Sequence, residues 1–293
     1  MPFELKKEKL ACGLYVVSTP IGNMRDITLR ALDILSNADH VYCEDKRVTG
    51  KLLSSYAIKT PLRLYHDHNG EKQRPDILAA LEDGQSVALV SDAGTPGVSD
   101  PGFKLFRYVI DAGHSIFPVP GASAALAALA GAGLATDRFL FAGFLPPKSA
   151  ARQAKLQTLK EMDATIILYE TANRMQAFVK DIKAVMGQRQ IVLARELTKK
   201  FEEFIRGDTE EILEILADKK FKGEFVVLIE GIDEKQLSDQ TWTGEKLDTL
   251  LSKAMGNMNM SVKDAAAYAA KESGQPKRKL YARAVILSKN GLV

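Results

Sequence analysis

VALVSDAGTPGVSDPG (residues 87–102) decides the fold, because it joins a strand-like run to a loop that can be neither helix nor strand. The apolar run VALV is typical of a buried strand. The twelve residues after it contain three glycines and two prolines, and they repeat Ser-Asp-x-Gly at Ser91 and at Ser99. Such a loop is nearly free of bulky side chains, so a ligand can approach its backbone closely.

Two further loops of this kind follow strand-like runs. STPIGN (residues 18–23) comes after GLYVV, and PGASAA (residues 120–125) comes after HSIFPV. Strand-like runs alternate with helix-like segments up to about residue 231, which predicts right-handed crossovers and a mainly parallel sheet, although the half after residue 121 looks more mixed. In such sheets ligands bind outside the carboxyl ends of the strands. Three such loops in one half of the chain therefore favour a ligand site.

The sequence predicts an α/β fold of two domains with a small C-terminal helical module. At residues 118–121 the composition shifts to alanine and glycine, which gives an N-terminal domain of residues 1–119 and a second domain of residues 120–232. In the second domain, the runs IVLAREL and FEEFIRG are close enough for an antiparallel hairpin. The remaining residues, 233–293, begin with a polar linker to residue 243 and continue as three helices with helix-turn-helix spacing.

Several local signals give more detailed expectations. Asp26 and Asn69 precede helical patterns and are expected to cap them, and Ser261 with Asp264 fits a capping box. Cys12 and Cys43 lie in or beside strand-like runs, so we expect two reduced, buried thiols rather than a disulfide.

Composition and missing motifs exclude several classes of protein. With 46% hydrophobic and 26% charged residues, the chain is typical of a soluble globular protein. It has no apolar run that would span a membrane and no secretory signal, so a cytoplasmic location is expected. The net charge of +3 permits a nucleic-acid partner without indicating one.

The common catalytic and nucleotide motifs are also absent. Neither GxxxxGK[ST], HExxH nor a Ser-His-Asp order occurs, and the HxH pair of His66 and His68 has no companion ligands. We therefore expect no triphosphate site, no covalent hydrolase and no metal. The ligand is expected to be compact and partly apolar, and the candidate acid–base groups near strand ends are Glu44, Asp45, Asp92, Asp100 and Glu170.

Five segments together resemble one family, the ribosomal RNA small subunit methyltransferases I, which have the tetrapyrrole methylase fold. They are VVSTPIGNMRDITLRAL, CEDKR, VALVSDAGTPGVSDPG, PVPGASAALAAL and GEFVVLIEG, and the resemblance runs from about residue 14 to the C-terminus. It implies methylation of the ribose 2′-oxygen of a cytidine in 16S rRNA of the small ribosomal subunit. It also implies a homodimer, with S-adenosylmethionine (SAM) in the cleft between the two α/β domains.

Two positions depart from the family pattern. Lys46 in CEDKR replaces the threonine that is usual there, which removes a hydroxyl and adds a charge suited to phosphate. Thr95 stands where many small-molecule members carry aspartate.

The resemblance further implies which residues contact the cofactor. They belong to the three loops and to three strands of the second domain: Thr19, Pro20, Ile21, Gly94, Thr95, Pro96, Val98, Ser123, Ala124, Tyr169, Ala194 and Glu224. A ribose hydroxyl is a weak nucleophile, so a general base would help, and we expect Asp100 or Glu170 in that role.

Two groups of basic residues are expected to bind RNA. Arg25, Lys46 and Arg47 would hold phosphates beside the target, and a second group begins the second helix of the helix-turn-helix: Lys277, Arg278 and Lys279. Two other functions remain open: methylation of a tetrapyrrole-type small molecule, and non-enzymatic ribosome binding with a vestigial SAM cleft. The basic module argues against the first and the intact loops against the second.

Overall fold

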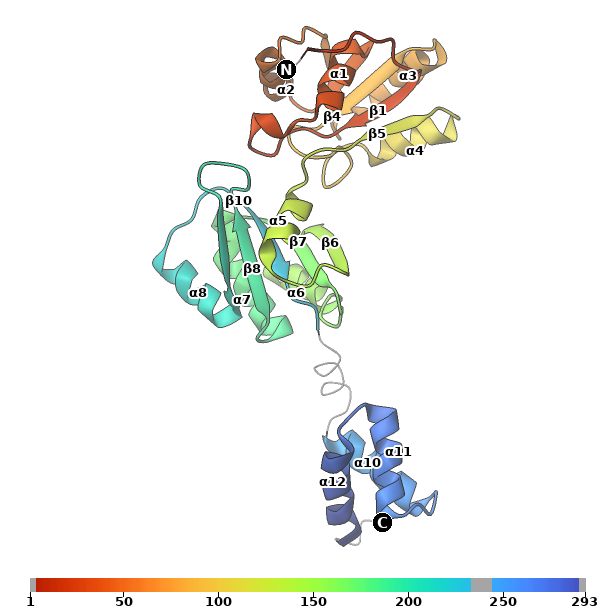
Figure 1. The fold of residues 1–293 in the computed structure, drawn as a ribbon, viewed down its shortest axis with the longest axis vertical. Coiled ribbons are helices and arrows are strands. Elements are labelled where there is room, and N and C mark those ends of the chain that lie inside the picture. The colour runs from red at the N-terminus through yellow and green to blue at the C-terminus, as the bar shows by residue number, and fades with distance from the viewer. Residues whose placement is uncertain (1–3, 233–243, 290–293) are drawn as a thin grey trace.

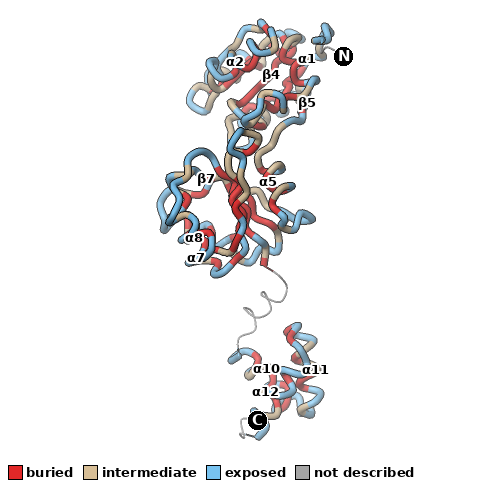
Figure 2. The backbone as a smooth tube through the Cα atoms, turned by 60° about the vertical axis from the view of Figure 1, so that its left-hand side comes forward, coloured by how far each residue is buried: buried red, intermediate tan, exposed pale blue. Residues whose placement is uncertain are grey.

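The computed structural model describes residues 4–232 and 244–289. Two units with a five-stranded sheet each are followed by a group of three helices (Figure 1). Buried residues concentrate on the sheets and on the helix faces turned toward them (Figure 2). The α/β fold with a C-terminal helical module was predicted, and it is confirmed.

The first sheet is entirely parallel, as the alternation of strands and helices predicted. Its strand order is β3-β2-β4-β1-β5. The strands are β1 (Gly13–Val17), β2 (His40–Cys43), β3 (Leu62–Leu64), β4 (Ser86–Val90) and β5 (Ile116–Val119). Every residue of β1 and of β4 is buried, because helices cover both faces of the sheet.

The helices on these two faces are arranged so that a crevice opens at the carboxyl ends of β1 and β4. Helices α1 (Leu29–Asn37) and α2 (Lys46–Ser55) pack on the face that carries Val17. Helices α3 (Gly70–Glu82) and α4 (Phe103–Asp111) pack on the face that carries Leu14. The helices that follow the neighbouring strands β1 and β4 thus lie on opposite faces, and such a switch point is where open α/β sheets bind ligands.

The second sheet is mixed. Its order is β6-β7-β10-β8-β9, in which only β6 and β7 are parallel. The strands are β6 (Phe139–Phe144), β7 (Thr165–Thr171), β8 (Gln190–Arg195), β9 (Glu203–Asp208) and β10 (Glu224–Ile229). The predicted antiparallel hairpin is confirmed as β8 and β9.

The two faces of this sheet are covered differently. Three helices pack on one face: α6 (Ser149–Gln157), α7 (Met175–Met186) and α8 (Thr209–Asp218). The other face packs against α5 (Ala124–Ala132), whose small alanine side chains allow a close approach. Side chains along β7 alternate between the faces, with Leu168 toward the three helices and Tyr169 toward α5.

Three local predictions were wrong. Thr28, not Asp26, caps α1, because residues Met24–Asp26 form a separate 3₁₀ turn (η1) whose own cap is Asn23. Asn69 precedes α3 but gives it no side-chain cap; its Oδ1 instead accepts the N–H of His66 at 2.8 Å. Cys12 is exposed, since it lies just before β1, whereas Cys43 is buried as expected.

The C-terminal helices are α10 (Gly244–Gly256), α11 (Val262–Ser273) and α12 (Lys277–Lys289). Their buried core contains no residue from either sheet unit. Ser261 caps α11 by accepting the N–H of Asp264 at 3.2 Å, which is half of the predicted capping box; the Asp264 carboxylate accepts the Ser261 hydroxyl at 2.6 Å instead of its backbone N–H. The predicted linker 233–243 lies outside the described residues. Within the described ranges, no helix has the length and apolar character needed to cross a membrane.

Candidate active site

The three glycine- and proline-containing loops meet and form one wall. The Thr19 N–H donates to the Gly94 carbonyl at 2.8 Å, and the Gly94 N–H donates to the Thr19 carbonyl at 3.1 Å. The hydroxyls of Ser18 and Thr95 lie 2.8 Å apart. The third loop lies against Ser18 as well, since a Cβ at Gly121 would be only 2.8 Å from the Ser18 Cβ. The sequence could predict the loops, but only the fold brings them together.

Gly94 has a backbone conformation in this wall that favours glycine. Its φ of +77° lies in the left-handed region, and its carbonyl and N–H are both used in the bridge to Thr19. Because both backbone groups of Gly94 are fixed, the Thr95-Pro96 segment that follows it is held in a defined position. The backbone of the loop thereby becomes a rigid surface for a ligand.

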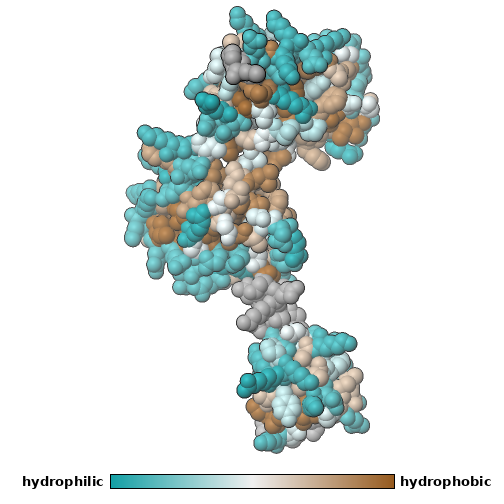
Figure 3. All heavy atoms as spheres, in the orientation of Figure 1, coloured by the Kyte–Doolittle hydropathy of each residue, from teal (hydrophilic) through white to brown (hydrophobic). Residues whose placement is uncertain are grey.

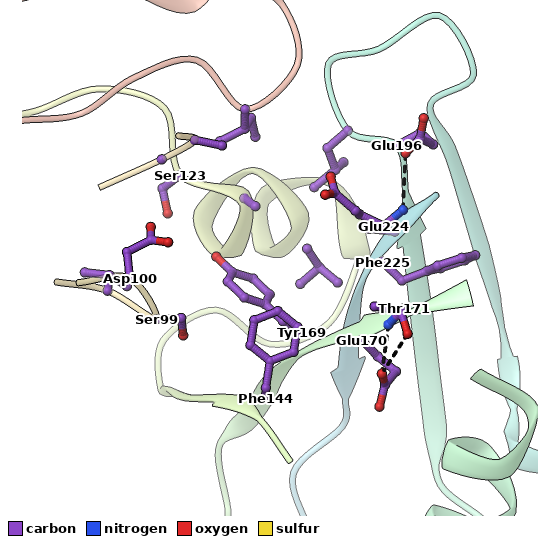
Figure 4. A pocket seen from close by; sticks show the side chains of 18 of the residues that line it. Ser99, Asp100, Ser123, Phe144, Tyr169, Glu170, Thr171, Glu196, Glu224 and Phe225 are labelled. Carbon is purple, nitrogen blue, oxygen red and sulfur yellow. Dashed lines mark hydrogen bonds between the residues drawn. The ribbon is translucent and has the colours of Figure 1, made fainter. Parts of the chain in front are cut away.

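A cavity of about 270 Å³ lies between this wall and the second sheet. Figure 4 shows its side chains converging from several segments, among them the Asp100 loop, β7 and β10. Nine of the twelve residues that were predicted to contact the cofactor line it: Ile21, Gly94, Thr95, Val98, Ser123, Ala124, Tyr169, Ala194 and Glu224. Their contacts with a cofactor stay predictions.

The other three predicted cofactor residues lie elsewhere. Thr19 and Pro20 line a second cavity of about 230 Å³, which shares Ile21 and Ala93 with the first. Pro96 lines neither of these two cavities. Thr19 does not line the larger cavity, but its backbone hydrogen bonds to Gly94 help to hold the wall of that cavity in place.

Tyr169 forms the aromatic floor of the larger cavity. Its ring contacts the rings of Phe141 and Phe144 edge to face, with centroids 4.9 and 5.4 Å away. Burial raises the pKa of its hydroxyl, which the backbone of Ala125 at the start of α5 partly offsets. In Figure 4 this hydroxyl points toward the side of the cavity where Asp100 and Ser123 lie. A flat or cationic ligand would find a π-surface here.

Asp100 is the carboxyl group of the cavity with the most perturbed acidity. Burial, and next the negative charge of Glu44, raise the pKa of Asp100 from 3.8 to about 6. A hydrogen bond from Ser91 opposes this rise in pKa, and the charge of Asp92 adds to it. A carboxyl group whose pKa lies near 6 is largely ionised at neutral pH, yet it is a better base than an ordinary aspartate.

Glu170, the other predicted catalytic residue, contributes to the lining but directs its carboxylate elsewhere. It follows Tyr169 on β7, so its side chain belongs to the opposite face of the strand. The carboxylate is fully buried, lies 3.1 Å from the Arg174 guanidinium, and accepts the N–H of Thr171 at 2.8 Å. Figure 4 shows it turned away from Tyr169 and Asp100. These contacts favour a structural role for Glu170 and leave Asp100 as the candidate general base.

Several lining residues were missed by sequence reasoning: Ala93, Ser99, Phe144, Thr171, Glu196, Leu197, Lys199, Phe225 and Val226. Phe144 follows a register shift in β6 at Gly143, whose φ is +63°, and a glycine inside a strand pattern was the signal that could have indicated it. Glu196, Leu197 and Lys199 belong to the β8–β9 turn, for which the sequence offered no glycine as a marker.

The β8–β9 turn is an unusually constrained segment. Glu196 and Thr198 have positive φ values of 49° and 64° although neither is glycine. Lys199 Nζ lies 3.0 Å from Glu196 and 3.1 Å from Glu224, which joins the turn to β10. Thr198 Oγ1 accepts the N–H of Asn23 at 3.0 Å, so the turn also fastens the first loop of the other sheet unit.

The charges of the cavity suit a cationic ligand with apolar parts. Asp100, Glu196 and Glu224 contribute three carboxylates against the single ammonium of Lys199, while aliphatic and aromatic side chains provide the remaining walls. Among the described residues, no group of three or more His, Cys, Asp or Glu side chains is arranged to hold a metal ion.

The predicted RNA-binding residues lie in two separate places. Arg25, Lys46 and Arg47 are exposed on the first sheet unit, where Arg47 also pairs with Asp45 at 2.6 Å. The second group is exposed at the start of α12: Lys277, Arg278 and Lys279. Neither group lines the larger cavity.

Comparison with known proteins supplies the family. A model of the tetrapyrrole (corrin/porphyrin) methylases matches residues 13–213, and one of the RsmI C-terminal HTH domain matches residues 243–288. The ribosomal RNA small subunit methyltransferase I of Synechocystis sp. is 42% identical over 282 residues, which cover 95% of this chain and 99% of the relative. That of Bacillus subtilis is 39% identical over 274 residues, which cover 92% of each.

Solved structures share the fold at low identity. Cobalt precorrin-4 methyltransferase is similar with a TM-score of 0.56 and 20% identity, over 74% of this chain and 94% of that one. Diphthine synthase is similar with a TM-score of 0.58 and 17% identity, over 74% and 89%. From these matches, the chain belongs to the tetrapyrrole methylase family and, within it, to the ribosomal RNA small subunit methyltransferases I.

Proposed function

We propose that this chain transfers the methyl group of SAM to the ribose 2′-oxygen of a cytidine in the 16S rRNA of the small ribosomal subunit. The observation that carries the proposal is Asp100, a partly buried carboxyl group with a pKa raised to about 6, which lines a cavity beside a rigid backbone wall. Family membership supplies the class of reaction and of substrate.

The cavity has the donors and charges that SAM requires. SAM, when bound, supplies a methyl group on a positively charged sulfur. Carboxylates of Asp100 and Glu224 and the ring of Tyr169 favour that charge, and the Gly94–Thr95 backbone with Ser123 offers polar groups for its amino-acid and ribose parts. Apolar walls from Ile21, Ala194 and other residues suit a flat purine.

Asp100 is proposed to act on the ribose hydroxyl. Its carboxylate would accept a hydrogen bond from the 2′-hydroxyl, hold the oxygen in line for displacement, and take up the proton as the oxygen becomes methylated. Glu170 is not needed for this step, because its carboxylate is bound to Arg174 on the far face of β7.

RNA and a second copy of the chain are the proposed macromolecular partners, in the cytoplasm. Arg25, Lys46 and Arg47 would hold phosphates near the cavity, and the basic start of α12 would hold phosphates farther away. For a homodimer, support comes from exposed hydrophobic side chains near the cavity and α5: Val98, Phe103, Leu126, Phe139 and Phe144. Figure 3 shows hydrophobic surface over the second sheet unit.

The boundaries of the domains are part of the proposal. We divide the chain into residues 1–119, 120–232 and 233–293, which is supported by the separate strand memberships of the two sheets and the separate core of α10–α12. Limited proteolysis that cuts first within the second sheet unit would contradict this division.

To test the function, the purified protein is incubated with labelled SAM and one of three acceptors: small ribosomal subunits, naked 16S rRNA or a porphyrin precursor. We expect label in the rRNA, at a single cytidine whose ribose resists alkaline cleavage. Label in the porphyrin alone would favour a small-molecule methylase, and SAM-independent binding to subunits without transfer would favour a non-enzymatic ribosome-binding protein.

A further inference from the structure

A second cavity, of about 230 Å³, opens next to the proposed SAM site. It lies between the loop after β1, the start of α2 and the loop after β4, and it shares Ile21 and Ala93 with the larger cavity. The walls are mostly apolar, with Pro20, Met24 and Leu52 among them. Three of the twelve residues predicted to contact the cofactor line it, Thr19, Pro20 and Ile21, and the other nine do not.

One polar side chain at this apolar cavity has an acceptor that no described group uses. Asp92, which is partly exposed, accepts the Asp45 N–H at 3.0 Å on Oδ1, and no described group donates to its Oδ2. Thr49 also lines the cavity, but its hydroxyl oxygen is fully buried beside the Cys43 sulfur. The Oδ2 atom of Asp92 is therefore the acceptor that a ligand in this cavity would meet.

The rim of the cavity is suited to a phosphodiester chain. Arg25 lies on η1 beside Met24, and Lys46 lies at the start of α2, two residues before the lining residue Val48. Both side chains are exposed, and no ion pair to either of them occurs among the described residues. A strand of RNA could thus be held by its phosphates while one base enters the apolar cavity.

We propose that this second cavity binds the cytosine base of the nucleotide whose ribose is methylated, with the Asp92 carboxylate accepting a hydrogen bond from the exocyclic amine. A carboxylate is the side chain that pairs with the cytosine N4 amine. The base would have to leave its stack to enter, as it does in enzymes that act on single nucleotides. The shared residues Ile21 and Ala93 would lie beneath the sugar, between base and cofactor.

This inference rests on the proposed function, and the two can fail separately. If the unaltered protein methylates none of the three acceptors, the proposed activity fails. If it methylates rRNA but the changes below have no effect, only the base cavity fails.

The first test blocks the cavity without touching the SAM site. The test variant is Val48→Trp, because Val48 is 42% exposed and lines only the second of the two cavities. The matched control is Leu29→Trp on α1, because Leu29 is 61% exposed and lines neither cavity. We expect Val48→Trp to lower kcat/KM for small subunits about tenfold or more. Its affinity for SAM, measured by calorimetry, should match that of Leu29→Trp. Full activity of Val48→Trp, or equal losses in both variants, would overturn the proposal.

The second test asks which base is recognised. Small subunits are reconstituted with either the mapped cytidine or a uridine at that position, and both are offered to the unaltered protein and to Asp92→Asn. An asparagine side chain can donate to the uracil carbonyl, so the cytidine-to-uridine ratio of kcat/KM should fall about tenfold or more in the variant. An unchanged ratio would overturn the contact between Asp92 and the base.

Discussion

Asp100 shows how a cavity can contain a carboxylate whose charge is disfavoured by burial. With its pKa raised from 3.8 to about 6 by burial and by Glu44, the folded protein binds this proton more tightly than the unfolded chain does. The free energy of unfolding therefore falls as the pH rises from about 4 to about 6, and the loss persists at neutral pH. The proposed reaction requires the carboxylate, which would account for the retention of this instability.

We predict that Asp100→Asn stabilises the protein at pH 7.5 and removes this pH dependence. The gain should be about 1 kcal/mol, since the carboxyl is only partly buried and solvent screens its charge. Urea denaturation at pH 7.5 and at pH 4.5 measures it: the variant and the unaltered protein should differ more at the higher pH. A larger difference at the lower pH would contradict the raised pKa.

The same carboxyl predicts the pH profile of methyl transfer. Single-turnover rates with saturating SAM should rise with pH to about 6 and level off above it, because the base acts in its ionised form. Asp100→Asn should lower the rate about a hundredfold and abolish that rise, while SAM still binds. A variant with the full rate and the same profile would remove Asp100 from the reaction.

The strands and their order along the chain could be predicted from the sequence, but the cavity residues that are brought into place by distant contacts could not. Apolar runs at β1 and β4 and the pairing of β8 with β9 follow from local pattern. The cap of α1 was assigned to Asp26 because the 3₁₀ turn before it leaves the same polar signal. Lys199 and Phe225 were missed because only the packing of β10 against β8 brings them to the cavity.

The β8–β9 turn carries a prediction of its own. Thr198→Val removes the hydroxyl that accepts the Asn23 N–H and so releases the turn from the first loop. A misplaced cavity wall should weaken SAM binding about fivefold, which corresponds to one lost hydrogen bond of about 1 kcal/mol. Calorimetric titration measures it. Thr158→Val, which loses only a local bond to the Lys155 carbonyl at the end of α6, is the control and should bind SAM normally.

Because α10–α12 have a core of their own, this module can be removed without taking any core residue from the two sheet units. Removing residues 240–293 should raise the KM for small subunits about tenfold, leave SAM affinity unchanged and keep the main thermal transition of the sheet units. Such a result would agree with an RNA-binding module. An unchanged KM would show that the module has another task.

A charge substitution tests the same module in the complete chain. In the first variant the exposed basic side chains at the start of α12 are replaced together: Lys277→Ala, Arg278→Ala and Lys279→Ala. The control variant replaces three exposed lysines elsewhere in the module: Lys253→Ala, Lys263→Ala and Lys271→Ala. Each phosphate contact that is lost should reduce the slope of log KM against log salt concentration by about one. If the start of α12 contacts phosphates, the slope of log KM against log salt concentration should fall by about two to three in the first variant and hardly at all in the control. Because both variants lose the same net charge, equal changes in slope would mean that the module attracts RNA only through its overall charge.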